Sequence, residues 1–362
     1  MQRNIERRGI FNFKNRNKVL THIKMKTKLI FVLSIILILF STCSNKKDDL
    51  LIAVQFGNKW GFVDEIGKFQ INPQFDDASS FWFVDSDLAR VKLNRSWGYI
   101  DRLGNFVINP QFEWAGDFYE GLAAIKLNDK FGFIDITGKI VINLVYDDAR
   151  FFSNGLAAVK KNGKWGYIDK KGTMVINPQF ENYGSFRSGL ACVALNGKIG
   201  FIDKSGKIVI NPQFDAGSYF SNGLAAVKKN GQMGYIDESG KFVIHPQFDY
   251  AYHFDHEMAC VRVNGKVGFI DQKGKYVINP QFEDGLSFRG ESLTAAVMNG
   301  KVGFIDRTGK IIVNPQYDLV KAFHNVLFVM EDKKIGIIDR DGNYIVRPMF
   351  DQVVYEDWIL ER

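Results

Sequence analysis

Short apolar runs alternate with turn-forming residues from residue 50 to the end of the chain. The segment 155–186 shows the pattern most clearly: its apolar runs are rich in Val, Ile, Tyr and Phe, and Gly, Asn, Asp or Pro bounds each of them. Such runs are typical of β-strands, whereas a helix needs about ten residues free of a breaker. We therefore expect three short strands in this segment, at 156–161, 165–169 and 174–177.

The residues between these runs predict how the strands are joined. Asn162 and Gly163 both tolerate positive φ and indicate a type I′ hairpin. Asp169 to Gly172 has the pattern of a type I turn, in which the Asp side chain bonds the backbone and Gly closes the turn. Pro178 cannot donate to a strand ladder, so we expect it to end the third strand. Phe180 and Phe186 are expected to pack under the connection to the next unit.

The whole region repeats this unit nine times. Every copy contains Gly, then an aromatic or aliphatic residue, then Ile or Val, then Asp, and the copies follow one another at intervals of 33 to 37 residues. All eight prolines of the chain fall at one phase of the repeat, where Leu144 takes the place of a ninth. The pattern predicts an all-β tandem array of nine units of about 34 residues over 50–362.

The two ends of the array suggest how it is arranged. The first unit begins inside a strand at Leu51–Val54, and Trp358–Leu360 has the pattern of the same strand starting a tenth time. Complementary ends usually latch a closed propeller. Because these ends look duplicated, an open curved solenoid is the favoured prediction, and a closed β-propeller-like ring is the alternative.

The repeated residues resemble the WG-repeat family, whose units read roughly KWGFID, GK, VI, PQFD and GLA in order. The resemblance covers about 50–360, although the Trp itself is kept only at Trp60, Trp97 and Trp165. Apolar residues fill that position elsewhere, which indicates packing and not ligand contact. The resemblance implies a β-rich, mostly bacterial and often exported protein with no established activity.

An apolar run precedes the repeats at 29–40, LIFVLSIILILF. Twelve residues are too few to span about 30 Å of hydrocarbon as a helix but suit the core of a signal peptide. Lys26 and Lys28 supply the positive charge that such a peptide carries before its core. We take Met25 as the true start, 1–24 as a non-native extension and 25–42 as the signal peptide. A long cytoplasmic arm before a signal anchor remains the alternative.

The apolar run is followed by Ser41, Thr42 and Cys43, which resemble a bacterial lipobox. The resemblance implies cleavage before Cys43 and attachment of lipid to its thiol, although Leu39 lies one residue too far from the cysteine. An ordinary signal peptide with an incidental cysteine is the alternative. The polar segment 43–49 is predicted to be a tether, and its Lys-Asp-Asp resembles the surface-export signal of some bacterial lipoproteins.

The charge distribution excludes one class of partner. The formal net charge is +7, but nine basic residues and a single acid lie in 1–42. The rest of the chain holds 38 basic and 39 acidic residues. Because a basic footprint is the main sign of nucleic-acid binding, we expect no nucleic-acid partner.

One aspartate recurs in every unit and raises the question of a metal site. Calcium needs six to eight oxygens around one point, whereas one Asp per unit spreads the carboxylates along the array. A turn explains each of them locally, so we expect a structural role and no bound metal. The nine are Asp64, Asp101, Asp135, Asp169, Asp203, Asp237, Asp271, Asp306 and Asp339.

Other candidate chemistry is sparse. His253 and His256, with Asp255, form the single histidine cluster and could supply two metal ligands. Cys192 and Cys260 occupy places where other units have Ala, so we expect core thiols and no disulfide between them. Motifs of known catalytic families are absent from the sequence, and a repeat duplicates residues where catalysis needs one asymmetric set. We expect neither an enzyme nor a cofactor.

An aromatic residue follows each proline position and allows two interpretations. The row is either a set of sugar-stacking platforms or a hydrophobic spine between units, and the spine is favoured. Its members are Phe75, Phe112, Tyr146, Phe180, Phe214, Phe248, Phe282, Tyr317 and Phe350.

These observations predict a monomeric, exported protein that is anchored to the bacterial cell envelope through lipid on Cys43. Exposure on the cell surface is compatible with this anchor. Repeat arrays present long surfaces and usually bind other macromolecules. An interaction scaffold with an unknown protein or glycan ligand is the favoured function. A carbohydrate- or peptidoglycan-binding module and a structural spacer are the alternatives.

Overall fold

The computed structural model describes residues 50–81, 86–288, 291–323 and 326–353. They belong to one compact unit, Leu50–Arg362. The signal peptide, Cys43 and the tether lie outside the described residues. Within the described part, no helix has the length and apolar character to cross a membrane.

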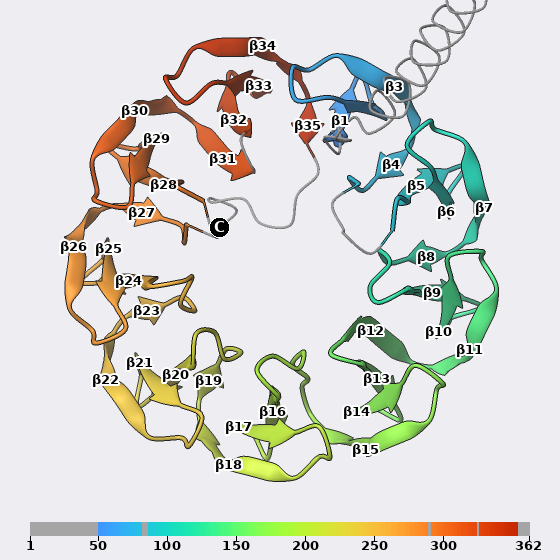
Figure 1. Cartoon of the computed structure of the whole chain (residues 1–362), viewed down its shortest axis with the longest axis horizontal. Helices are drawn as coiled ribbons and strands as arrows, with labels where there is room; N and C mark the ends of the chain where they lie inside the picture. The colour runs from blue at the N-terminus through green and yellow to red at the C-terminus, as the bar shows by residue number, and fades with distance from the viewer. Residues whose placement is uncertain (1–49, 82–85, 289–290, 324–325, 354–362) are drawn as a thin grey trace, which may run out of the picture. The chain divides into compact units, whose positions relative to one another are not determined.

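The described strands form nine small antiparallel sheets, which follow one another around a ring (Figure 1). Blade 4 shows the plan: β12 (Asp148–Ser153) is innermost, β13 (Leu156–Lys161) and β14 (Lys164–Asp169) follow, and β15 (Met174–Phe180) is outermost. The two predicted turns lie where the sequence placed them, between β13 and β14 and between β14 and β15. The three strands expected in this unit are confirmed, and the structure adds a fourth, innermost strand that the sequence did not predict.

The other blades repeat this plan in chain order. The innermost strands are β4 (Asp77–Ala78), β8 (Trp114–Ala115), β19 (Ala216–Gly217), β23 (Tyr250–Ala251), β27 (Asp284–Gly285), β31 (Leu319–Phe323) and β35 (Gln352–Val353). The second strands are β1 (Ile52–Phe56), β5 (Ala89–Leu93), β9 (Leu122–Leu127), β16 (Leu190–Leu195), β20 (Leu224–Lys229), β24 (Met258–Val263), β28 (Leu293–Met298) and β32 (Val326–Glu331). In blade 5, a single bridge between Asn182 and Ala194 stands in place of the innermost strand.

The third strands are β2 (Lys59–Val63), β6 (Ser96–Ile100), β10 (Lys130–Asp135), β17 (Lys198–Asp203), β21 (Gln232–Asp237), β25 (Lys266–Asp271), β29 (Lys301–Asp306) and β33 (Lys334–Ile338). The outer strands are β3 (Phe69–Phe75), β7 (Phe106–Phe112), β11 (Ile140–Tyr146), β18 (Ile208–Phe214), β22 (Phe242–Phe248), β26 (Tyr276–Phe282), β30 (Ile311–Tyr317) and β34 (Tyr344–Phe350). Blade 1 consists of β35, β1, β2 and β3, so it combines the two ends of the array.

Strand β35 closes the ring. It pairs with β1 through Val54 opposite Val353, and Asp351 donates its N–H to the carbonyl of Gln55 at 2.8 Å. A buried cluster joins blades 1 and 9 and includes Ile52, Val54, Val63, Val326, Phe328, Ile335, Ile337, Phe350 and Val353. The alternative prediction, a closed ring, is therefore confirmed, and the favoured open solenoid is wrong.

The physical reason lies in where a blade begins. The chain enters blade 1 at its second strand and returns, 300 residues later, to supply the missing innermost strand. The ends are complementary, as in other closed propellers. The segment Trp358–Leu360, on which the solenoid prediction depended, lies outside the described residues.

The outer strand is longer than predicted. Strand β15 continues through Pro178 to Phe180, whereas the sequence placed its end at the proline. A missing N–H is tolerated there because β15 is the edge strand of its blade.

The outer strand also bulges over the glycine of each Gly–aromatic–Ile–Asp motif. In blade 4 the register shifts between Trp165 and Tyr167, and a Cβ on Gly166 would lie 2.4 Å from the carbonyl oxygen of Ile176. That distance is shorter than real Cβ contacts, so only glycine fits. The same approach recurs at Gly61, Gly98, Gly132, Gly200, Gly234, Gly268, Gly303 and Gly336.

Buried clusters join each blade to the next. Phe152 packs on Phe133 of the preceding blade, with ring centroids 4.9 Å apart, and Phe180 and Phe186 are 2% and 1% exposed. The aromatic row that follows the prolines is buried in all nine blades. The hydrophobic spine is therefore confirmed, and the sugar-platform interpretation of this row is wrong.

Candidate functional site

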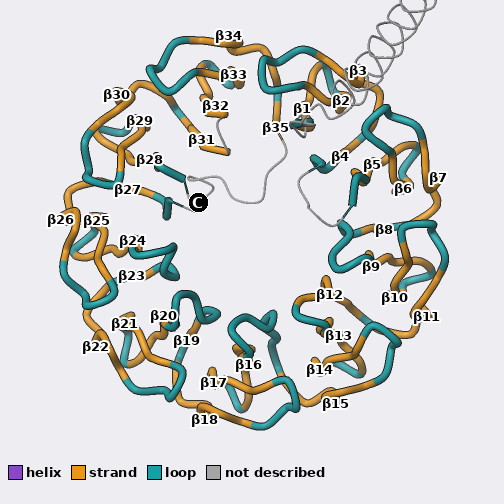
Figure 2. The backbone as a smooth tube through the Cα atoms, viewed as in Figure 1, coloured by secondary structure: helices purple, strands orange, loops and turns teal. Residues whose placement is uncertain are grey.

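The two faces of the ring carry different parts of each blade. Because the strands are antiparallel, the hairpin turns between second and third strands share one face with the connections between blades. The Asp turns share the opposite face with the loops that join the innermost strands to the second strands. We call the connections at 116–121, 184–189, 218–223 and 252–257 the inner loops, and we include 150–155, where the bulged end of β12 takes the same place. Figure 2 shows them projecting towards the centre of the ring.

The hairpin face is built alike in most blades. A lysine that opens the third strand pairs with an acid that follows the outer strand, as Lys130 Nζ does with Asp147 at 2.7 Å. Asp147 also accepts the N–H of Asn162 in the hairpin of the next blade. The bond from Lys130 and, to a smaller extent, the bond from Asn162 lower the pKa of Asp147. Equivalent lysine pairs are Lys59–Asp76, Lys164–Glu181, Lys198–Asp215, Lys301–Asp318 and Lys334–Asp351. Repetition of one contact makes this face a structural frame.

The recurring aspartates all lie in turns. Asp169 accepts the N–H groups of Lys171 and Thr173 at 2.9 and 2.8 Å, and its carbonyl accepts the N–H of Gly172. At Asp203 the side chain of Ser205 donates an additional bond, which lowers the pKa of that carboxyl group. The same backbone bonds occur at Asp64, Asp101, Asp135, Asp237, Asp271, Asp306 and Asp339. In the described ranges, no group of three or more His, Cys, Asp or Glu side chains is placed to hold a metal.

The structure separates the two histidines of the candidate cluster. His253 Nε2 lies 2.9 Å from the hydroxyl of Tyr219, while His256 Nδ1 lies 3.0 Å from Asp255 Oδ1. The two rings thus have different partners, and His253 becomes part of an aromatic contact with the neighbouring blade.

The two repeat cysteines are free thiols at the predicted positions in the second strands. Cys260 is buried, and Cys192 is half-buried. Burial raises the pKa of Cys192 to about 12 and also raises the pKa of Cys260.

We predict that neither thiol reacts readily in the folded protein at pH 8. A raised pKa leaves little thiolate, the form that attacks a disulfide reagent. Labelling of the full-length Cys43→Ala chain with Ellman's reagent should be slow in buffer and should release two equivalents in denaturant. Rapid native labelling of both would contradict the burial described here.

The inner loops combine a constant part with a variable part. Each contains a buried phenylalanine that packs on an aromatic ring of a third strand, as Phe186 does on Tyr167 at 5.0 Å between centroids. The residues on either side of this phenylalanine differ from loop to loop. In consecutive blades 3 to 7 they are Tyr119, Phe151, Arg187, Tyr219 and His253, and we call these five residues the inner row.

Contacts within the inner row join successive blades. Tyr119 and Phe151 stack with centroids 4.4 Å apart and an interplanar angle of 28°. The Arg187 guanidinium lies 4.0 Å from the centroid of Tyr219, and that ring in turn lies 4.7 Å from His253. Arginine over an aromatic face is a cation–π contact that holds the guanidinium in place.

A β-bulge in β12 turns Phe151 out of the blade and into the hollow described below. Ala149 pairs with Val159 and Phe152 with Ala157, so Arg150 and Phe151 together oppose one residue. Bulges commonly redirect side chains beside functional sites. Here Arg150 turns over Trp165 within the blade, whereas Phe151 remains 39% exposed.

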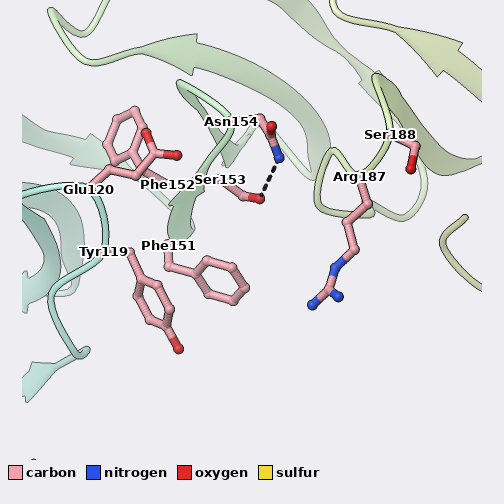
Figure 3. Close-up of a pocket in the computed structure, with 8 residues that line it drawn as sticks. All are labelled: Tyr119, Glu120, Phe151, Phe152, Ser153, Asn154, Arg187 and Ser188. Atoms are coloured by element: carbon pink, nitrogen blue, oxygen red, sulfur yellow. Dashed lines mark hydrogen bonds between the residues drawn. The ribbon is translucent and has the colours of Figure 1, made fainter. Parts of the chain in front are cut away.

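Three residues of the inner row, Tyr119, Phe151 and Arg187, border a hollow of about 480 Å³ that is widely open to solvent. Its lining is Tyr119, Glu120, Phe151, Phe152, Ser153, Asn154, Arg187 and Ser188. Figure 3 shows Tyr119, Phe151 and Arg187 extending to the same side, with Asn154 and Ser188 above them. An aromatic floor therefore lies beside a cation and several polar groups.

The charge around the hollow is predominantly positive. Glu120 accepts the N–H of Gly155 and pairs with Lys170 at 3.1 Å, so its carboxylate is compensated. Lys204 donates to the carbonyl of Asn154 at 2.8 Å. Arg187 forms no ion pair within the part of the chain that the structure describes. Three cations and one acid thus surround a surface on a chain whose repeats are nearly neutral.

The fold and this surface define a nine-bladed β-propeller whose inner loops differ on an otherwise repeated frame. The chain belongs to the WG containing repeat family, whose model matches eight units at 60–95, 97–131, 131–165, 165–198, 199–232, 233–266, 268–301 and 303–334. The predicted family is confirmed.

Solved structures share the fold at low sequence identity. A crystal structure described as that of "the eukaryotic initiation factor" is 12% identical, with a TM-score of 0.63, and the match covers 86% of this chain and 98% of that one. Apo AztD from Citrobacter koseri is also 12% identical, with a TM-score of 0.44 and coverage of 84% and 96%. Among curated protein sequences, none matches this chain. The first likeness supports the propeller fold and extends no further.

Proposed function

We propose that this chain is a non-enzymatic, lipid-anchored scaffold of the bacterial cell envelope and that it binds macromolecules through its inner-loop face. A repeat propeller suits a binding role, because it offers one broad surface built from many loops. The exported location and the anchor rest on the apolar run at 29–40 and on Cys43.

One observation carries the binding role. Nine blades repeat the same turns, glycines and buried aromatics, yet the inner loops of blades 3 to 7 differ from each other and carry the inner row, of which Phe151 and Arg187 are exposed. A spacer needs no such differences. Aromatic residues and arginine are the types enriched where proteins bind partners.

The polar groups of the hollow support binding over catalysis. Ser153 Oγ and Asn154 Nδ2 both donate to the carbonyl of Phe186, at 3.2 and 2.7 Å. Glu120 is engaged by Lys170 and Gly155. These contacts hold the loops in place, and a catalytic group would need to face a reacting atom instead.

Capture from envelope extracts tests the binding role. The wild-type chain is compared with the double variant Phe151→Ala/Arg187→Ala and with Val209→Ala, which changes an exposed residue of the outer strand β18. We expect specific partners to be retained by wild type and Val209→Ala and lost by the double variant. Equal capture by all three proteins would reject the inner loops as the binding face.

The anchor gives a separate prediction. Cys43→Ala should abolish incorporation of a fatty-acid analogue and release the protein from membranes, because the thiol is the proposed attachment point. One acyl chain binds membranes marginally, whereas two or three anchor a protein stably. Ser44→Ala is the matched control and should still be labelled. Labelling that persists in Cys43→Ala would mean that the lipobox interpretation is wrong.

A further inference from the structure

We propose that the hollow beside the inner row binds a saccharide that carries a carboxylate. This inference rests on the proposed binding function and names the chemical class of one ligand for that face. It concerns a surface that the sequence did not identify, because the aromatic row considered there is buried.

The first argument is the aromatic floor. One face of a pyranose ring presents C–H groups and is apolar, so it packs flat against an aromatic ring. Tyr119 stacks on one face of Phe151 at 4.4 Å and 28°, so the floor is the remaining surface of Phe151, which is 39% exposed beside the bulge in β12. Leaving a large apolar side chain exposed forgoes its burial energy, and contact with a ligand would recover it.

The second argument is the charge at the edge of that floor. The Arg187 guanidinium has no carboxylate partner in the described residues, and the ring of Tyr219 holds it in place. Arginine binds carboxylates through two parallel hydrogen bonds. Lys204 adds positive charge at a neighbouring loop, whereas Lys170 and Glu120 offset each other, so an anionic ligand is favoured over a neutral one.

The third argument separates a saccharide from an acidic peptide. An extended peptide commonly binds by adding a strand to an exposed sheet edge. The innermost strand of blade 3 is two residues long, and blade 5 has a single bridge in that place. In blade 4, β12 is six residues long, but the bulge at Arg150 and Phe151 interrupts its ladder. Such short or interrupted edges offer few consecutive backbone groups, whereas the hydroxyl groups of a sugar require side-chain partners. The amide oxygen of Asn154 and the hydroxyl of Ser188 lie at the rim, while the donors of Ser153 and Asn154 bond the carbonyl of Phe186.

A panel of defined saccharides tests the inference on the full-length chain in detergent micelles. The acidic probes are tetragalacturonate, a hyaluronan tetrasaccharide and sialyllactose. The neutral probes are methyl-esterified tetragalacturonate, chitotetraose and lactose. Hexaglutamate represents an acidic peptide. We expect calorimetric binding of at least one acidic saccharide and a loss of at least about tenfold in affinity for its neutral counterpart, because the bond to charged Arg187 is lost.

Variants then locate the binding. Arg187→Ala and Phe151→Ala should each lower the affinity for the acidic saccharide by about tenfold or more. Arg347→Ala is the matched control, because Arg347 is also exposed and lies over Tyr344, but on the outer strand β34. It should leave affinity unchanged. Circular dichroism and melting verify that each variant is folded.

Three results would overturn the inference: binding of none of the acidic saccharides, equal affinity for the esterified and free acids, or binding of hexaglutamate alone. The proposed function has a different failure. If the double variant Phe151→Ala/Arg187→Ala loses its envelope partners while wild type binds none of these saccharides, the inner loops still bind partners and the ligand class is wrong.

Discussion

Deletion of residues 317–362 is expected to abolish the cooperative unfolding of the propeller. In an open array, deletion of one terminal unit would reduce the stability only modestly, because each unit contacts only its neighbours. In the ring, the deletion removes blade 9 and the innermost strand of blade 1, and it exposes an apolar face on each side of the gap. Side chains that lose their cover are Ile52, Val54, Val63, Val297, Val302, Phe304 and Val313.

The size of this effect follows from the buried area. Exposing seven such side chains at about 1.5–3 kcal/mol each costs on the order of 10 kcal/mol. A folded domain has about 5–15 kcal/mol of total stability. Thermal melting followed by circular dichroism should show no sharp transition. A well-folded truncated protein with a slightly lower Tm would contradict ring closure.

A cysteine pair tests the same closure without removing residues. Gln55 and Gln352 lie directly opposite each other in the pair formed by β1 and β35. The double variant Gln55→Cys/Gln352→Cys should form an intramolecular disulfide on oxidation, because opposite residues of an antiparallel pair have Cβ atoms about 4.5–5.5 Å apart. Either single variant is the control. If the two cysteines fail to cross-link, β1 and β35 are not paired and the ring is open.

Replacement of Gly234 by alanine is expected to destabilise the ring strongly. Its Cβ would lie 2.6 Å from the carbonyl oxygen of Ile244 and 2.7 Å from the nitrogen of Pro246, and both are backbone atoms. The outer strand β22 would have to move away from β21, which breaks the bulge and opens the blade. We expect a loss of about 3 kcal/mol or more in the free energy of unfolding, measured by denaturant titration.

Gly285→Ala is the matched control for this substitution. Ala115 and Ala251 occupy the same place in the innermost strands of other blades, and the nearest atom to a new Cβ is Cγ1 of Val267, at 3.1 Å. A side chain can yield where a backbone cannot, so the change should stay within about 0.5 kcal/mol. Equal losses at Gly234 and Gly285 would refute the account of the bulge.

The sequence predicted the blades well because each strand and turn is encoded locally. The Asn162–Gly163 hairpin and the turn at Asp169 follow from residues that tolerate or stabilise those backbone conformations. The innermost strands have no comparable signal, since most are two residues long. Ring closure depends on the pairing of β35 with β1, which lie at opposite ends of the array. No local sequence pattern predicts such a long-range pairing.

The proline error and the missed site have related causes. Pro178 was expected to end a strand, but its nitrogen lies over Gly166 in the bulge of an edge strand, where no ladder N–H is needed. The inner row likewise depends on the arrangement of blades, because Tyr119, Phe151 and Arg187 are about 34 residues apart and meet only in the ring. A signal was present: aromatic residues flank the repeated phenylalanine in some units and not in others.

Site-specific photo-crosslinking in living cells tests the binding face most directly. A benzophenone side chain replaces Phe151 in the hollow or, as controls, Val209 and Val243 on the exposed outer strands β18 and β22. The proposed function predicts cross-linked adducts of defined mass from position 151 and none above background from the outer positions. Adducts from the outer strands, with none from position 151, would contradict it.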